Sequence, residues 1–168
     1  MNISKLLTTV LAAVVLSPLS VSAGSFNDSK ELIELIKTTG THVSVNTNSF
    51  DKNCPGKAGY YQYIKDVSDV LVVCEDQINK HDPHELWKVI SHESTHVMQA
   101  CKGRNLFKES YLPRIFRTLS TKAPHYAKMI DTQYSATVAI KEAEAFYMEL
   151  QPPADVMQMF KLACLSGN

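Results

Sequence analysis

The segment that most constrains the fold is 83–101, which is predicted to form a helix with one apolar side. Asp82 can cap its N-terminus, Pro83 suits the first helical turn, and Gly103 can end it. The apolar side consists of residues at helical spacing: Leu86, Val89, Ile90, Val97 and Ala100. This side of the helix is therefore expected to be buried.

The remaining segments predict an α+β fold. Before the central helix we expect a helix capped by Asn27 or Asp28, and then three strands of which the last two form a hairpin. These elements are predicted at 29–38, 42–45, 60–64 and 70–74, with the hairpin turn at 65–69. After it we expect helices, at 106–119, 123–131, 132–150 and 153–165. The sequence thus predicts a small antiparallel N-terminal sheet or hairpin packed on a mainly helical C-terminal half.

The N-terminal residues 1–23 have the features of a signal peptide. Lys5 supplies a positive charge, an apolar stretch follows, and Val21-Ser22-Ala23 offers small residues for cleavage. The apolar stretch is short for a membrane span, although an uncleaved anchor is the alternative interpretation. We therefore expect a secreted or periplasmic protein with one zincin-like domain over 24–168.

The charge balance bears on the partners of the protein. Among 168 residues, 17 are basic and 17 are acidic, whereas nucleic acids or anionic membranes would favour a basic excess. We expect no nucleic acid, no membrane after removal of the signal peptide, and a monomer.

Four cysteines in an exported chain indicate disulfides rather than free thiols. We favour Cys54–Cys74, which would close the hairpin, and Cys101–Cys164, which would tie the central helix to the C-terminal helix. The alternative is a structural zinc site, but the chain has no C-x-x-C spacing.

Residues 92–96 of the central helix read H-E-S-T-H. His92 and His96, four residues apart, lie on nearly the same side of a helix and can bind one Zn²⁺ ion. Glu93 falls on the apolar side, where a carboxylate is costly unless it has a partner such as a metal-bound water. The alternative interpretation is a helix whose histidines pack without metal.

A catalytic zinc ion needs a third protein ligand. A downstream histidine at the usual short spacing is absent, because Gln99 and Lys102 occupy positions of that pattern. Glu142 and Glu144 are the candidates, and they cannot both face one ion because they are two residues apart on a helix. We favour Glu142, whose helical neighbours are apolar, and keep Glu144 as the alternative.

This pattern resembles the gluzincin metallopeptidases, in which H-E-x-x-H is followed by a glutamate on a later helix. Residues 142–146 resemble the Glu-Ala-x-x-Phe motif of compact members, while 142–145 also match a Glu-x-Glu-Ala variant that would make Glu144 the ligand. The resemblance covers about residues 60–150. It implies zinc, peptide hydrolysis and a substrate lying along a sheet edge. The chain departs from larger members because Phe146 and Met148 stand where an acidic residue would follow the ligand.

The predicted function is therefore that of a secreted zinc metallopeptidase acting on a peptide or protein substrate. His92, His96 and Glu142 would hold Zn²⁺, and Glu93 would be the general base. The alternatives are a non-catalytic, metal-stabilised binding protein and a disulfide-linked module whose motif is accidental. Spacing does not choose an oxyanion donor from the available side chains, which are Tyr126, Tyr134, Tyr147 and His125.

Overall fold

The computed structural model describes residues 24–46, 51–63 and 69–166. It confirms the α+β class, with a small sheet near the N-terminus and a helical C-terminal half. The predicted signal peptide and most of the predicted turn at 65–69 lie outside the described residues. In the part of the chain that is described, no helix has the length and apolar character that a membrane span requires.

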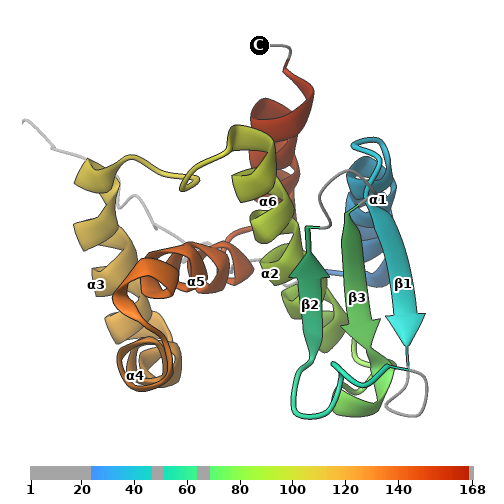
Figure 1. The fold of residues 1–168 in the computed structure, drawn as a ribbon, viewed down its shortest axis with the longest axis horizontal. Helices are drawn as coiled ribbons and strands as arrows, with labels where there is room; N and C mark the ends of the chain where they lie inside the picture. Colours follow the sequence, from blue (N-terminus) through green and yellow to red (C-terminus); the bar gives the residue numbers. More distant parts are fainter. Residues whose placement is uncertain (1–23, 47–50, 64–68, 167–168) are drawn as a thin grey trace, which may run out of the picture.

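The central helix is α2, Pro83–Lys102, and it begins and ends where the sequence predicted. The Asp82 side chain accepts a hydrogen bond from the backbone N–H of His84, and Gly103 takes a left-handed conformation with φ of 61°. This helix packs against α1 (Phe26–Lys37), the sheet and the C-terminal helices. Figure 1 shows it between the sheet and α1 on one side and the helices α3, α4 and α5 on the other.

The sheet contains three strands in the order β1-β3-β2, namely β1 (His42–Asn46), β2 (Gly59–Gln62) and β3 (Val70–Cys74). The predicted antiparallel hairpin of β2 and β3 is confirmed. The sheet as a whole is mixed rather than antiparallel, because β1 pairs with β3 in parallel. Strands β1 and β2 thus lie at opposite edges of the sheet, with β3 between them.

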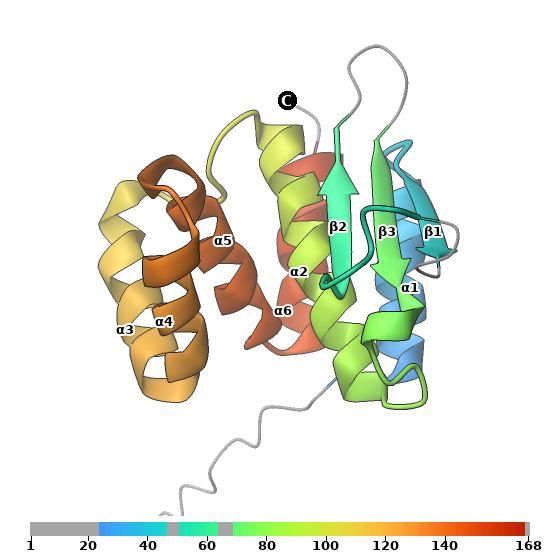
Figure 2. The same cartoon turned by 60° about the horizontal axis from the view of Figure 1, so that its bottom comes forward.

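Strand β3 is the middle strand of the sheet (Figure 2), and its residues 71–74 are buried. Leu71 and Val73 belong to the main core beneath the helices, whereas Val72 and Cys74 pack on the opposite face with Cys54. The Cys54–Cys74 disulfide is formed as predicted and fastens the loop before β2 to the end of β3.

The C-terminal half consists of four helices, α3 (Leu112–Lys122), α4 (Pro124–Gln133), α5 (Ala136–Glu149) and α6 (Pro153–Phe160). A π-helical turn continues α6 to residue 165 and carries Cys164, which forms the predicted disulfide with Cys101 at the end of α2. The two views show α5 lying across α2, with α3 and α4 on the far side (Figures 1 and 2).

Several predicted helix boundaries differ from the structure by a few residues; α5, for example, starts at Ala136 rather than at 132. Helix α1 starts at Phe26 rather than 29, because Ser25 and Asp28 cap it by reciprocal hydrogen bonds. The helix predicted from 106 begins only at Leu112. Leu106 and Phe107 lie outside any helix because their backbone N–H groups donate to the side chain of Glu144, and a short 3₁₀ turn, Glu109–Tyr111, precedes α3.

Strand β2 is an edge strand that lies close to α2. The hydrogen bond from the Cys74 N–H to the Ala58 carbonyl, together with the register, pairs the backbone groups of Tyr60 with β3. The backbone N–H and C=O groups of Gly59 and Tyr61 therefore point to the free edge. At Gly59 an added Cβ atom would lie 2.7 Å from Val89 Cγ1, so only glycine permits this approach.

We predict that Gly59→Ala lowers the free energy of unfolding by about 1–3 kcal/mol, because the methyl group overpacks the contact between β2 and α2. Val89→Ala removes Cγ1, the atom nearest to the added methyl group. The double variant should therefore lose less stability than the sum of the single variants in urea unfolding. Strictly additive losses would mean that Gly59 and Val89 are not in contact.

Candidate metal centre

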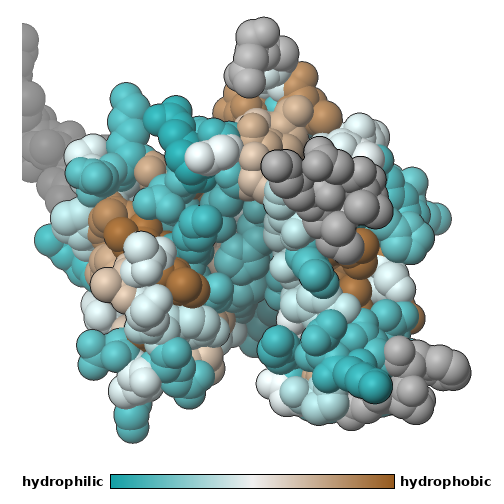
Figure 3. Space-filling view, in the orientation of Figure 1, coloured by the Kyte–Doolittle hydropathy of each residue, from teal (hydrophilic) through white to brown (hydrophobic). Residues whose placement is uncertain are grey.

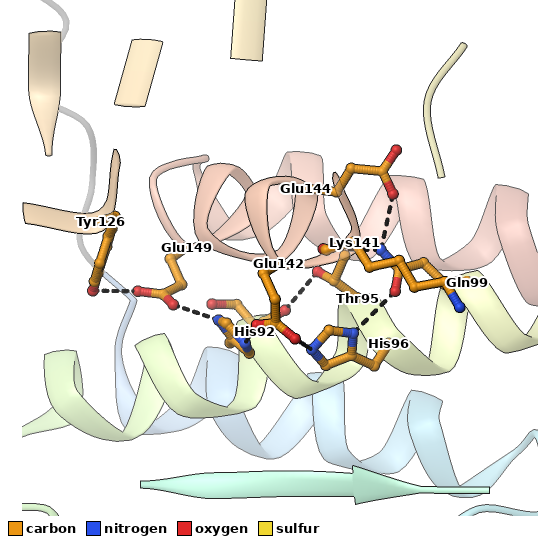
Figure 4. Close-up of polar contacts among 10 residues, drawn as sticks. His92, Thr95, His96, Gln99, Tyr126, Lys141, Glu142, Glu144 and Glu149 are labelled. Carbon is orange, nitrogen blue, oxygen red and sulfur yellow. Dashed lines mark hydrogen bonds and ion pairs between the residues drawn. The ribbon is translucent and has the colours of Figure 1, made fainter. Parts of the chain in front are cut away.

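Three side chains with metal-binding groups converge between α2 and α5. His92 and His96 come from successive turns of α2, and Glu142 comes from α5. One ligand atom from each lies within 4.8 Å of the others. His92 Nε2 is 3.4 Å from Glu142 Oε2, and His96 Nε2 is 3.6 Å from Glu142 Oε1. Figure 4 shows Glu142 pointing from α5 toward both imidazole rings.

The other ring nitrogens of the two histidines are held by hydrogen-bond acceptors. His92 Nδ1 is 2.7 Å from Glu149 Oε1, and His96 Nδ1 is 2.9 Å from Gln99 Oε1. Because both partners are acceptors, each Nδ1 donates to its partner, and each Nε2 faces Glu142, where it would bind a metal ion once it is deprotonated. Tyr126 in turn donates to Glu149 Oε2 at 2.6 Å, which fixes that carboxylate (Figure 4).

Charges in the site shift the pKa values of the three converging groups. Burial opposes protonation of His92, but hydrogen bonds to Glu142 and Glu149 outweigh it and raise the His92 pKa to about 10. Burial and the neighbouring charge of His92 lower the pKa of His96. Burial alone would raise the Glu142 pKa, yet the contacts with the two histidines hold it below its ordinary value. The site is thus a compact set of coupled charges, and a bound cation would displace a proton from it.

Glu93 is buried beside the metal-binding groups, on the side of α2 that faces β2. Its side chain lines the cleft and its Cγ atom lies 3.3 Å from the place of a Cβ at Gly59. Burial raises the pKa of Glu93 to about 7, although the charge of His92 opposes this. A carboxyl group that titrates near neutral pH can both accept and release a proton.

Glu144 lies away from the two histidines. It is fully buried, and its carboxyl oxygens accept hydrogen bonds from Gln99 Nε2 at 2.8 Å and from the backbone N–H groups of Leu106 and Phe107 at 2.7 and 2.8 Å. The apolar helical neighbours of Glu142 suggested a buried position for it, but Glu144 is the more buried of the two, since the side chain of Glu142 is 15% exposed. Neighbours on the same helix did not reveal the loop at 106–107 that covers Glu144.

The converging groups open into a cleft of about 700 Å³. Residues of α2 and of the segment leading into β2 form one wall, and residues of α4 and α5 form the other. Figure 3 shows the hollow between these two parts of the molecule, lined mainly by hydrophilic residues. The cleft is therefore large enough for several residues of an extended chain.

The structure separates the four candidates for an oxyanion donor. Tyr147 bonds with Tyr111, and Tyr126 is engaged with Glu149. His125 packs on the ring of Tyr126. Tyr134 lines the cleft, and its hydroxyl has no hydrogen-bond partner among the described residues. Burial, followed by the charges of nearby carboxylates, raises its pKa, so it remains a hydrogen-bond donor.

Sequence reasoning missed Glu149 and Gln99, the residues that orient the two histidines. Glu149 follows Glu142 by seven residues, which is two helical turns, so it lies on the same side of α5. Gln99 follows His96 by three residues on α2 and could have been found in the same way. A search for polar residues at these helical spacings would have identified both.

The chain belongs to the family described as domain of unknown function DUF8637, which matches residues 16–165. No curated protein and no solved structure matches it significantly. The family assigns no activity, so the function has to be argued from the site.

We predict that Glu144→Gln lowers the free energy of unfolding by about 2–4 kcal/mol, because the new amide NH₂ group faces buried N–H donors. Glu142→Gln should cost only about 1 kcal/mol, since this side chain borders the cleft. Urea unfolding of both variants tests the assignment of structural and cleft-facing roles. Equal losses would contradict it.

We further predict that Glu93→Gln stabilises the zinc-free protein at alkaline pH. Folding raises the Glu93 pKa from 4.5 to about 7, so the stability linked to its neutral form is full below about pH 4.5 and is lost as the pH rises to about 7. Above that, the buried charge costs about 3 kcal/mol, and glutamine avoids this cost. In thermal unfolding with a chelator, the Glu93→Gln variant should have a higher Tm than the wild type at about pH 8. This difference in Tm should disappear toward about pH 4. A difference in Tm that does not change with pH would disprove the raised pKa of Glu93.

Proposed function

We propose that this protein is a secreted or periplasmic zinc metallopeptidase of the gluzincin type. His92, His96 and Glu142 would hold Zn²⁺, and Glu93 would be the general base. The observation that carries the proposal is the convergence of two imidazole Nε2 atoms and one carboxylate, with both Nδ1 atoms already bonded. The two disulfides support an oxidising compartment.

The residues fit zinc in number and in kind. Two imidazole nitrogens and one carboxylate oxygen are a usual catalytic ligand set that leaves one position open. When bound, zinc would lower the pKa of a water molecule and polarise a substrate carbonyl. The contacts of Glu149 and Gln99 would keep the imidazoles in the required tautomer and orientation.

Glu93 supplies the proton transfer in this proposal. Its carboxylate would take a proton from the attacking water and deliver it to the leaving nitrogen. No hydrogen bond to this carboxylate occurs within the described residues, and a buried group of this kind is costly for a purely structural role. Tyr134 is the proposed donor to the developing oxyanion, since its protonated hydroxyl borders the cleft.

The substrate would bind as an extended strand along the free edge of β2. The outward backbone groups of Gly59 and Tyr61 can pair with a peptide in the way a further strand would. Gly59 lies level with Glu93, so the peptide bond nearest to this residue would be presented to the general base.

The rival function is a non-catalytic protein that binds a metal ion for stability or for partner recognition. This rival leaves the position and raised pKa of Glu93 without a role, because zinc binding does not require a further carboxylate beside the ligand Glu142. We therefore prefer the peptidase.

We predict that the mature chain binds one equivalent of zinc and cleaves peptides. Glu93→Gln should keep the zinc and lose at least about a thousandfold in turnover, because the proton acceptor is removed. Zinc content by mass spectrometry and cleavage of a mixed peptide library measure the two properties. His96→Ala is the control that should lose zinc as well.

Two results would contradict the proposal. A wild-type chain that holds zinc but cuts no peptide in the library would favour the non-catalytic rival. A wild-type chain that binds no zinc at all would favour an accidental motif.

A further inference from the structure

Two lysines border one end of the cleft, and neither has a role in the proposed reaction. Lys88 precedes His92 by one turn of α2, and Lys57 precedes Gly59 by two residues. Strand β2 and helix α2 run in the same direction in Figure 1, so both lysines lie toward the same end. Strand β2 and helix α2 approach each other closely at Gly59 and Val89, next to the two lysines in the sequence.

Both lysines are exposed side chains that border the cleft. Neither forms an ion pair within the described residues, whereas Lys37 and Lys80 do so elsewhere on the surface.

One acidic side chain, Glu85, lines the same end of the cleft. Its Oε2 accepts a hydrogen bond from the backbone N–H of Asn79 at 2.5 Å, so this oxygen is engaged by the backbone. Two lysines and one glutamate thus border this end of the cleft. This end of the cleft carries a positive charge that can attract an anionic group.

An extended peptide on the edge of β2 would reach this end. Two residues of a strand span roughly 7 Å, so a peptide paired at Gly59 would pass Lys57 about two residues from the bond presented to Glu93. We propose that Lys57 and Lys88 form a carboxylate-binding subsite that selects peptides with a carboxylate about two residues from the cleaved bond. This inference rests on the proposed peptidase function and names its substrate class.

A carboxylate at this position has two sources, an acidic side chain or the free C-terminus of the substrate. Both present the same pair of oxygens to the ammonium groups. Peptides that share one cleaved sequence can distinguish the two sources. One set compares aspartate with asparagine at each flanking position, and the other compares a free with an amidated C-terminus.

The test compares kcat/KM for these peptides between the zinc-loaded wild type and the double variant Lys57→Gln with Lys88→Gln. The wild type should prefer the carboxylate peptide about tenfold, because two partly exposed ion pairs are together worth a factor of this size. The double variant should lose this preference and cleave the neutral peptide unchanged. Lys52→Gln, an exposed lysine outside the cleft lining, is the matched control and should keep it.

Charge reversal sharpens the test. Lys57→Glu with Lys88→Glu should favour peptides with lysine at the same position over those with aspartate. A wild type without preference for either carboxylate source, or a double variant that keeps the preference, would overturn the subsite.

Binding separates this inference from the proposed function. The affinity of the zinc-loaded Glu93→Gln variant for fluorescent acidic and neutral peptides can be measured by anisotropy without cleavage. A carboxylate preference in binding, with no cleavage by the wild type, would support the subsite and reject the peptidase. Cleavage by the wild type without any carboxylate preference would support the peptidase and reject the subsite.

Discussion

The packing of α5 across α2 is the interaction on which the site depends. Buried Glu144 fixes it, because one carboxyl group accepts hydrogen bonds from Gln99 on α2 and from the backbone of the loop before α3. With α5 held in this way, Glu142 faces the two histidines and Glu149 reaches His92. Gln99 contacts Glu144 and His96 at once, so the structural and the metal-binding contacts are joined through a single side chain.

The two disulfides crosslink different parts of the domain that carries the site. Cys54–Cys74 fastens the loop that carries Lys57 and leads into β2, and Cys101–Cys164 fastens the end of α2 to the C-terminal turn. A small domain that buries several ionisable groups in one site gives up stability there, since each group is removed from water. Crosslinks of this kind offset that cost by restricting the unfolded chain.

The sequence predicted the features that depend on residues close together in the chain. The caps and apolar side of α2, the hairpin and the pairing of histidines four residues apart all follow from neighbours in the sequence. The parallel pairing of β1 and the burial of Glu144 depend on contacts between distant segments, and no spacing along the chain encodes them. Glu142 was therefore favoured for a partly mistaken reason, although the structure brings it to the histidines.

In the function we propose, His92, His96 and Glu142 hold one zinc ion. Crystals of the mature protein grown with zinc, measured on both sides of the zinc absorption edge, test it directly. The account predicts one anomalous peak within bonding distance of His92 Nε2, His96 Nε2 and a Glu142 oxygen, with Glu144 still bonded to the loop at 106–107. A peak elsewhere, or no peak between α2 and α5, would contradict it.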